Sequence, residues 1–389
     1  CIMPLTKIAF APGIDKQDTE YGAAGRWTDS DFVRFRYGLP EKIGGWIKLI
    51  QNTLVGVARD MHAWTDLNGV RYTAIGTDRK LYIYTEGVAY DITPVRATGS
   101  ITGFETFSST SVTVTDPSHG ADVGDFVTIS STSGAVNGIP AATMDAEYQI
   151  LTVPDANTYT ITTAAAATST GTSSETATAT YQISVGTAVS QYGYGWGTWQ
   201  WGKEAWGTAR STSNVTIDGR NWSFDNFGED LLATVNNGNT FRWDTSVGTG
   251  TPAAVISNAP TVSRFNLVSM PDRHVFLFGT ETTIGNSNTQ DDLFLRFASQ
   301  EDYNTWSPTA TNTAGSFRVQ DGSKIITAVR SRNAVLVWTD TSLNALQFVG
   351  APFTFNLTQI GANCGAVSLH SAVDVNGTAF WMSQNSFYK

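Results

Sequence analysis

The side chains that most often carry chemistry are sparse in this sequence and lie far apart. The four histidines share no spacing typical of metal ligands. They are His62, His119, His274 and His370. The two cysteines, Cys1 and Cys364, form no C-x-x-C pair, and no nucleophile elbow, P-loop or dinucleotide fingerprint occurs. The sequence therefore predicts no metal site, no cofactor and no enzymatic activity.

One short stretch, SQEDYNTW at residues 299–306, partly matches a known turn. It resembles the Asp-box of sialidase-type propellers, with Ser299, Thr305 and Trp306 in place. Glu301 stands where that box has Asp, and Tyr303 where it has Gly. Because the box is a structural turn, the match favours a fold and not an activity. Glycoside hydrolysis needs two carboxyl groups about 5–10 Å apart, and the sequence nominates no such pair.

The elements that would position these residues are recurring strand pairs. Alternating apolar residues flank a turn at residues 77–80 within Arg71–Pro94, which is typical of a β-hairpin. Similar units begin near Asp230, His274, Ala334 and Thr378. Their spacing is close to the roughly 40–50 residues of a four-stranded propeller blade, except where the polar loop Glu281–Asp292 intervenes. The pattern favours a β-propeller over the alternative, an antiparallel β-sandwich.

Composition indicates an all-β chain with more than one domain. The 389 residues include 36 Gly, 20 Phe, 13 Tyr and 12 Trp. We predict an N-terminal segment and first blade at 1–98, an inserted Thr/Ser-rich β domain at 99–186, and the remaining blades at 187–389. The blade pattern reaches Phe387–Lys389, so the propeller is either incomplete at its C-terminus or completed by early strands from Leu5 to Phe35.

Charge and hydropathy restrict the partners. The net charge is −10 and the sequence has no Lys/Arg run, which disfavours a grip on DNA phosphates or on anionic membranes. No transmembrane run of about 18 apolar residues and no signal peptide is present. The sequence predicts no membrane segment and synthesis in a reducing cytoplasm.

Two aromatic segments are candidate protein–protein contacts. The first, around Arg26, Trp27, Arg34 and Arg36, combines arginine with aromatic residues, as interface anchors do, and also fits a packed strand with Arg–Asp pairs on its rim. The second is YGYGWGTWQWGKEAWG, residues 192–207. Its aromatic candidates are Tyr192, Tyr194, Trp196, Trp199, Trp201 and Trp206. We favour packing and assembly contact for them over a sugar-stacking platform.

Several long motifs in one order resemble a known family. They include GRWTDSDFVRFRYGLPEKIGGW, NWSFDNFGEDLLA, SQEDYNTWSPTATNTAGSF, AVLVWTDTSLNALQFVGAPFTF and GANCGAVS. They look like the tail nozzle, or tail tubular (stabilisation), proteins of short-tailed bacteriophages, over most of the chain outside the insertion. Residues 111–162 separately resemble a small β module found in phage virion proteins.

The resemblance implies a structural role in the virion. It implies a propeller in a ring of copies of this chain, usually six, assembled in the host cytoplasm and stacked below the portal and adaptor. Other tail proteins, including tail fibres, would be partners, and phage DNA would pass through without specific binding. Two alternatives remain open: a propeller-based tail protein that binds or depolymerises host glycans, and an adaptor or stopper that contacts the portal.

Overall fold

The computed structural model describes residues 11–45, 47–50, 52–184, 191–192, 216–217, 219–270, 272–350 and 353–389. It divides the chain into two compact units, Cys1–Gln51 and Asn52–Lys389. The predicted segment 1–98 therefore contains a boundary, because the first blade belongs to the second unit.

The first unit contains a β-hairpin. Strand β1 (Val33–Arg36) pairs antiparallel with β2 (Leu39–Lys42). The two turn residues between them, Tyr37 and Gly38, both have positive φ, 51° and 79°. This conformation matches the right-handed twist of paired strands, so it fixes a tight two-residue connection.

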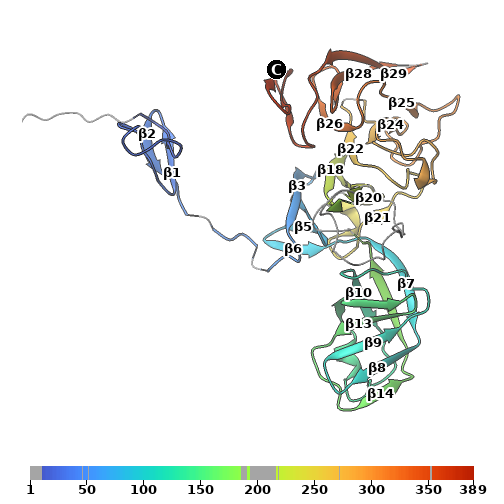
Figure 1. The fold of residues 1–389 in the computed structure, drawn as a ribbon. Coiled ribbons are helices and arrows are strands. Elements are labelled where there is room, and N and C mark those ends of the chain that lie inside the picture. The colour runs from blue at the N-terminus through green and yellow to red at the C-terminus, as the bar shows by residue number, and fades with distance from the viewer. Residues whose placement is uncertain are drawn as a thin grey trace, which may run out of the picture. The chain divides into compact units, whose positions relative to one another are not determined.

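Five sheets in the described part of the second unit are antiparallel meanders of consecutive strands (Figure 1). The first sheet holds β3 (Ala58–Thr65), β4 (Arg71–Thr77), β5 (Leu81–Thr85) and β6 (Val88–Asp91). The second sheet holds β18 (Trp222–Phe227), β19 (Asp230–Val235), β20 (Thr240–Trp243) and β21 (Ala254–Val255). The third sheet holds β22 (Phe265–Val268), β23 (Val275–Phe278), β24 (Phe294–Phe297) and β25 (Gly315–Arg318).

The remaining two sheets follow in the same order. The fourth sheet holds β26 (Ile325–Arg330), β27 (Val335–Thr339), β28 (Ser342–Gly350) and β29 (Thr354–Ala362). The last sheet holds β30 (Ala372–Val375), β31 (Thr378–Met382) and β32 (Phe387–Tyr388). The predicted turn at 77–80 is confirmed, since it lies between β4 and β5. The turn residues of the units that begin near Asp230, Ala334 and Thr378 also predict turns, at 236–239, 339–342 and 384–385, and these are confirmed because each lies between two of the strands.

Successive sheets pack as propeller blades do. Strand β18, the first of the second sheet, contacts β3 of the first sheet and β22 of the third. Strand β26 of the fourth sheet contacts β30 of the last sheet. Trp222 donates from its indole Nε1 to the carbonyl of Thr77, 2.8 Å away, which joins the second sheet to the first. A Cβ on Gly76 would stand 2.4 Å from the same indole ring, so the close approach requires glycine there. The chain is all-β with a β-propeller-like series of blades and an inserted β domain, as the sequence predicted.

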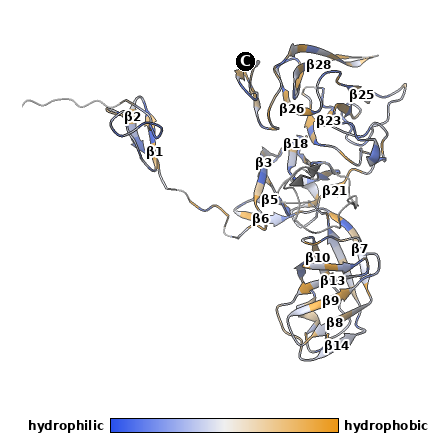
Figure 2. Cartoon of the chain, viewed as in Figure 1, coloured by the Kyte–Doolittle hydropathy of each residue, from blue (hydrophilic) through white to orange (hydrophobic). Residues whose placement is uncertain are grey.

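The insertion is a two-sheet domain with its own core. One sheet has the strand order β11-β10-β15-β7 and the other β12-β13-β9-β8-β14. Threonine alternates with buried Tyr159 and Ile161 along β13, which gives one apolar face for the core and one polar face for water. Figure 2 shows the apolar residues on these strands.

The strands of the insertion have these bounds. The first of its two sheets holds β7 (Val95–Ile101), β10 (Phe126–Ser130), β11 (Glu147–Gln149) and β15 (Ala177–Gln182). The second holds β8 (Gly103–Phe107), β9 (Ser111–Thr115), β12 (Thr152–Asp155), β13 (Thr158–Thr162) and β14 (Thr170–Ser173). A short helix, α1 (Ala141–Met144), lies between β10 and β11. Strand β7 thus begins before the predicted boundary at residue 99.

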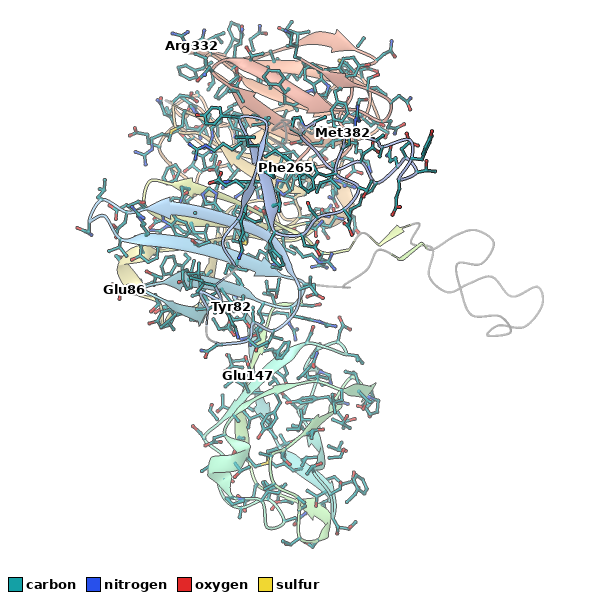
Figure 3. The ribbon with its side chains drawn as sticks, turned by 90° about the vertical axis from the view of Figure 1, so that its left-hand side faces the viewer. Tyr82, Glu86, Glu147, Phe265, Arg332 and Met382 are labelled. Atoms are coloured by element: carbon teal, nitrogen blue, oxygen red, sulfur yellow. The ribbon has the colours of Figure 1, made fainter. Side chains whose placement is uncertain are left out.

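Lys80 joins the insertion to the first sheet. Its side chain is 2 % exposed, and its Nζ lies 2.6 Å from Asp91 Oδ2 and 2.6 Å from Glu147 Oε1. The ammonium also lies 4.5 Å from the centre of the Phe126 ring in β10. Gln182 donates to Glu147 Oε1 at 2.9 Å. Figure 3 shows Glu147 on the insertion and Tyr82 on the first sheet, on the two sides of this junction.

Candidate functional site

The predicted arginine–aromatic contact lies in the first unit. Arg26 pairs with Asp15 at 3.2 Å and Arg34 with Glu41 at 3.1 Å. Asp29 pairs with Lys16 at 2.6 Å, so of these three ion pairs one, Arg26 with Asp15, joins arginine to aspartate. The guanidinium of Arg36 lies 5.4 Å from the centre of the Tyr37 ring.

Trp27 and the second aromatic segment complete the predicted candidates. Trp27 forms a backbone bridge with Ile14 in the first unit. Tyr192 belongs to a short strand, β16 (Gln191–Tyr192), which pairs with β17 (Thr216–Ile217). The other members of that segment lie outside the described residues: Tyr194, Trp196, Trp199, Trp201 and Trp206. The role of all these residues in assembly stays a prediction.

The last sheet presents an apolar face that sequence reasoning did not single out. Its inner face packs on the fourth sheet, where the Trp381 and Trp338 rings lie 5.5 Å apart. The opposite face carries five apolar side chains that are 42–82 % exposed. They are Val373, Val375, Phe380, Met382 and Phe387. The sequence does carry a signal for this face, because these residues alternate with inward-facing ones at the period of a strand. We refer to them as the last-sheet face.

The stretch 299–306 is a structural turn, as its sequence predicted. The Ser299 amide donates to the carbonyl of Thr305 at 2.8 Å and closes the turn. Trp306 is buried, and its Nε1 donates to the carbonyl of Tyr303 at 2.8 Å. Glu301 has a φ of 55°, the left-handed conformation in which the backbone reverses direction.

A hydrogen-bonded relay behind this turn has the order of a catalytic triad. Asp272 Oδ2 lies 2.9 Å from His274 Nδ1, and His274 Nε2 lies 3.1 Å from Thr313 Oγ1. The pKa of Asp272 is lowered: burial opposes the shift, but hydrogen bonds from His274 and Ser269 outweigh it. Sequence reasoning missed this relay, because Thr313 lies in another loop, 39 residues after His274.

Its surroundings favour a structural role for the relay. His274 is fully buried, and the Phe355 ring lies edge-on to it at 4.9 Å. Thr313 Oγ1 also accepts the Gln300 amide at 2.7 Å, so its lone pairs hold the turn onto the third sheet. An activated nucleophile instead needs open space for a substrate beside it. The relay therefore anchors the turn 299–306.

The same turn forms one wall of a pocket of about 380 Å³. Tyr303 and Asn304 come from the turn, and the opposite side is formed by the end of the second sheet. The other lining residues are Arg242, Asp244, Val247, Thr251, Pro252, Ala254, Val255, Ile256 and Ser257. The volume is at the lower end of the roughly 300–1,000 Å³ of small-molecule sites.

Charge beside the pocket is set by one arginine between two aspartates. Arg242 lies 2.6 Å from Asp230 and 2.8 Å from Asp244, and its guanidinium lies 4.7 Å from the centre of the Tyr303 ring. The pKa of Asp244 is lowered, first by hydrogen bonds from Ser246 and then by Arg242. The three charges sum to −1, so this group is a poor partner for an anion.

Among the residues that the structure describes, no group of three or more His, Cys, Asp or Glu side chains is arranged to hold a metal ion. No helix in the described part of the chain is long and apolar enough to cross a membrane. The expectations of no cofactor and no enzymatic activity stay predictions.

Comparisons with known proteins add little to this description. No family model and no curated protein matches the chain. Among solved structures, the chain is similar to the phage phi92 endosialidase, with 13 % sequence identity and a TM-score of 0.31. The match covers 88 % of this chain and 55 % of that one, so the chain spans about half the length of the endosialidase. At that TM-score no residue or activity can be transferred between the two.

Proposed function

We propose that the chain is a structural subunit of a bacteriophage tail, in a ring of copies that forms part of the DNA-ejection conduit. The order of motifs that resemble tail nozzle proteins supports this proposal. The virion is the corresponding location, with the portal, adaptor and tail fibres as neighbours. The net charge of −10 suits a channel through which DNA slides, because each neutralised phosphate would strengthen a salt-dependent grip.

The observation that carries the proposal is the last-sheet face. The other face of this sheet packs on the fourth sheet, whereas the last-sheet face has five exposed apolar side chains. An exposed apolar patch of this kind marks a protein–protein contact. Subunits in a cyclic ring present two different surfaces to each other, and the last-sheet face supplies one of them.

A charge placed on this face tests the proposal. We expect Phe380→Lys to prevent ring assembly while leaving the far-UV circular dichroism and the unfolding midpoint of the subunit unchanged. Gln384→Lys is the matched control, because it adds the same charge at the exposed turn of the same sheet. Sedimentation velocity reports the assembly. Rings of unchanged size from Phe380→Lys would contradict the role of this face, and a chain absent from purified tails would contradict the function.

A second candidate function, a tail protein that binds host-surface glycans, is favoured by the pocket beside the turn 299–306. Its lining combines apolar walls with an amide, hydroxyls and a carboxylate, the mixture of groups that small polar ligands require. Glycan-array binding by the purified chain tests this candidate. No glycan retained on the array would count against it and would leave the tail proposal untouched.

A further inference from the structure

We propose that the pocket between the second sheet and the turn 299–306 binds a neutral saccharide without cleaving it. The inference rests on the glycan-binding candidate, and it is independent of the position of the chain in a tail. It places that function at a site different from the aromatic segment 192–207. Three properties of the pocket carry it: the chemistry of its polar groups, its charge, and the single carboxylate among its described lining residues.

Two polar side chains of the lining suit sugar hydroxyls. Asn304 and Ser257 are exposed lining residues, and their side chains make no hydrogen bond to another described residue. The Asn304 amide both donates and accepts, as does the Ser257 hydroxyl. A sugar hydroxyl also donates and accepts, so it can pair with either group. The exposed Val247 and Val255 side chains provide apolar surface for the C–H face of a sugar ring.

The charge of the pocket selects against anionic sugars. Arg242 is the cation of the lining, but Asp230 and Asp244 both bind it. A carboxylated sugar would have to approach a group of net charge −1. Like charges at close range are unfavourable where water is partly excluded. We therefore expect neutral hexoses or N-acetylhexosamines, and not sialic acid, to bind.

The state of Asp244 explains why binding would not lead to cleavage. Glycoside hydrolysis requires a carboxylic acid that protonates the leaving group and a second carboxylate opposite it. Among the described residues that line the pocket, Asp244 is the single carboxylate. Its pKa is lowered by the hydrogen bonds from Ser246 and by Arg242, so it stays ionised and has no proton to donate.

Saturation-transfer NMR on the full chain tests the inference with named probes. The neutral probes are maltotriose, cellotriose and tri-N-acetylchitotriose, and the anionic probe is 3′-sialyllactose. We expect at least one neutral probe to bind and the anionic probe to give no signal. We expect Asn304→Ala to weaken that binding about three- to tenfold, as the loss of one hydrogen bond does. Asn258→Ala is the matched control, because Asn258 is an exposed neighbour that does not line the pocket.

A second variant tests whether binding occurs at this site, and a second measurement tests whether the sugar is cleaved. Val255→Lys places a long cationic side chain at the pocket wall and should abolish binding, while circular dichroism verifies its fold. Reducing-end assays on the bound probe should show no release of sugar. Binding of the sialylated probe alone, or neutral binding that survives both variants, would overturn the inference. Binding elsewhere on the chain would leave the glycan-binding candidate standing and reject only this site.

Discussion

The buried Lys80 bridge gives a sharp prediction, because one side chain joins the insertion to the first sheet. Replacing Lys80 by Met keeps the apolar stem but removes the charge shared by Asp91 and Glu147. Two carboxylates would then face each other with Gln182 as their remaining shared donor. The first sheet and the insertion should separate more easily as a result.

The size of the effect follows from burial. Removing one partner from a buried ion pair costs about 3–5 kcal/mol. Here the Asp91 and Glu147 side chains are 30 % and 36 % exposed, so water screens their repulsion. We expect Lys80→Met to lower the free energy of unfolding by about 2–3 kcal/mol at pH 7. Adding Glu147→Gln should restore about half of the loss, since one carboxylate then remains.

The pH dependence has a defined sign. The pKa of Lys80 is raised: burial opposes the shift, but hydrogen bonds to Asp91 and Glu147 outweigh it. The pKa of Asp91 is lowered: burial again opposes the shift, and bonds from Lys80 and Thr93 outweigh it. The stability contributed by Lys80 is present below pH 10.5 and is lost as the pH rises through the pKa of Lys80 in the folded protein. The stability contributed by Asp91 is present above pH 3.8 and is lost as the pH falls through the pKa of Asp91 in the folded protein. The loss of stability caused by Lys80→Met should therefore be largest between these two pH values and should become smaller in acid.

Urea denaturation and hydrogen exchange measure the prediction together. We expect faster amide exchange in β10 and β11, which carry Phe126 and the Glu147 side of the bridge. Lys324→Met is the control, because Lys324 is an exposed lysine. A Lys80→Met protein within about 0.5 kcal/mol of the original chain, the level of ordinary surface substitutions, with unchanged exchange in these strands, would refute the reasoning.

Three further predictions concern the sheets, the turn and the insertion. Trp381→Ala removes the ring packed against Trp338 and the indole hydrogen bond to the Cys364 carbonyl, so we expect a loss of about 3–5 kcal/mol by urea denaturation. Phe387→Ala replaces a side chain that is 82 % exposed and should cost under about 0.5 kcal/mol. Equal losses from both variants would reject the packing described for the last sheet. Thr313→Val removes the hydroxyl that is hydrogen-bonded to His274 Nε2 and to the Gln300 amide. We expect the variant to lose about 1–3 kcal/mol of stability and to show faster amide hydrogen exchange in residues 299–306. Unchanged exchange there would show that the relay does not anchor the turn. The Ile183 amide lies 2.9 Å from the Pro94 carbonyl, so replacing the insertion by a short Gly-Ser link from Pro94 to Ile183 should leave a soluble protein that circular dichroism shows to be β-rich. Deletion of residues 100–185 instead cuts β7 and should give a protein that aggregates more. Aggregation of both proteins would contradict the independence of the sheets from the insertion.

Local sequence patterns predicted the hairpins better than the surfaces they form. Strand alternation and turn residues located β4 and β5 around Thr77–Lys80 and the turn at 236–239, because both signals act within a few residues. The insertion was found from its Thr-rich composition, but its boundary was missed at β7. That strand pairs with β15, some 80 residues later, and no local signal marks such a partner.

The candidate sites depended on contacts between distant segments, which periodicity does not reveal. Lys80 meets Glu147, and Arg242 meets Tyr303, only after the chain has folded. Asp29 and Arg34 are close in sequence, yet Asp29 pairs with Lys16 instead. The last-sheet face was visible as alternation, but whether a strand face is covered depends on which sheet packs against it. The turn 299–306 was predicted correctly as structural, because its closing bonds are local.

An electron cryomicroscopy map of the intact phage tail would show whether copies of this chain form a ring in the virion. We expect a ring in which Val373, Phe380 and Phe387 are buried against a neighbouring subunit. A map in which the chain is absent from the tail, or in which the last-sheet face remains open to solvent in every copy, would contradict it.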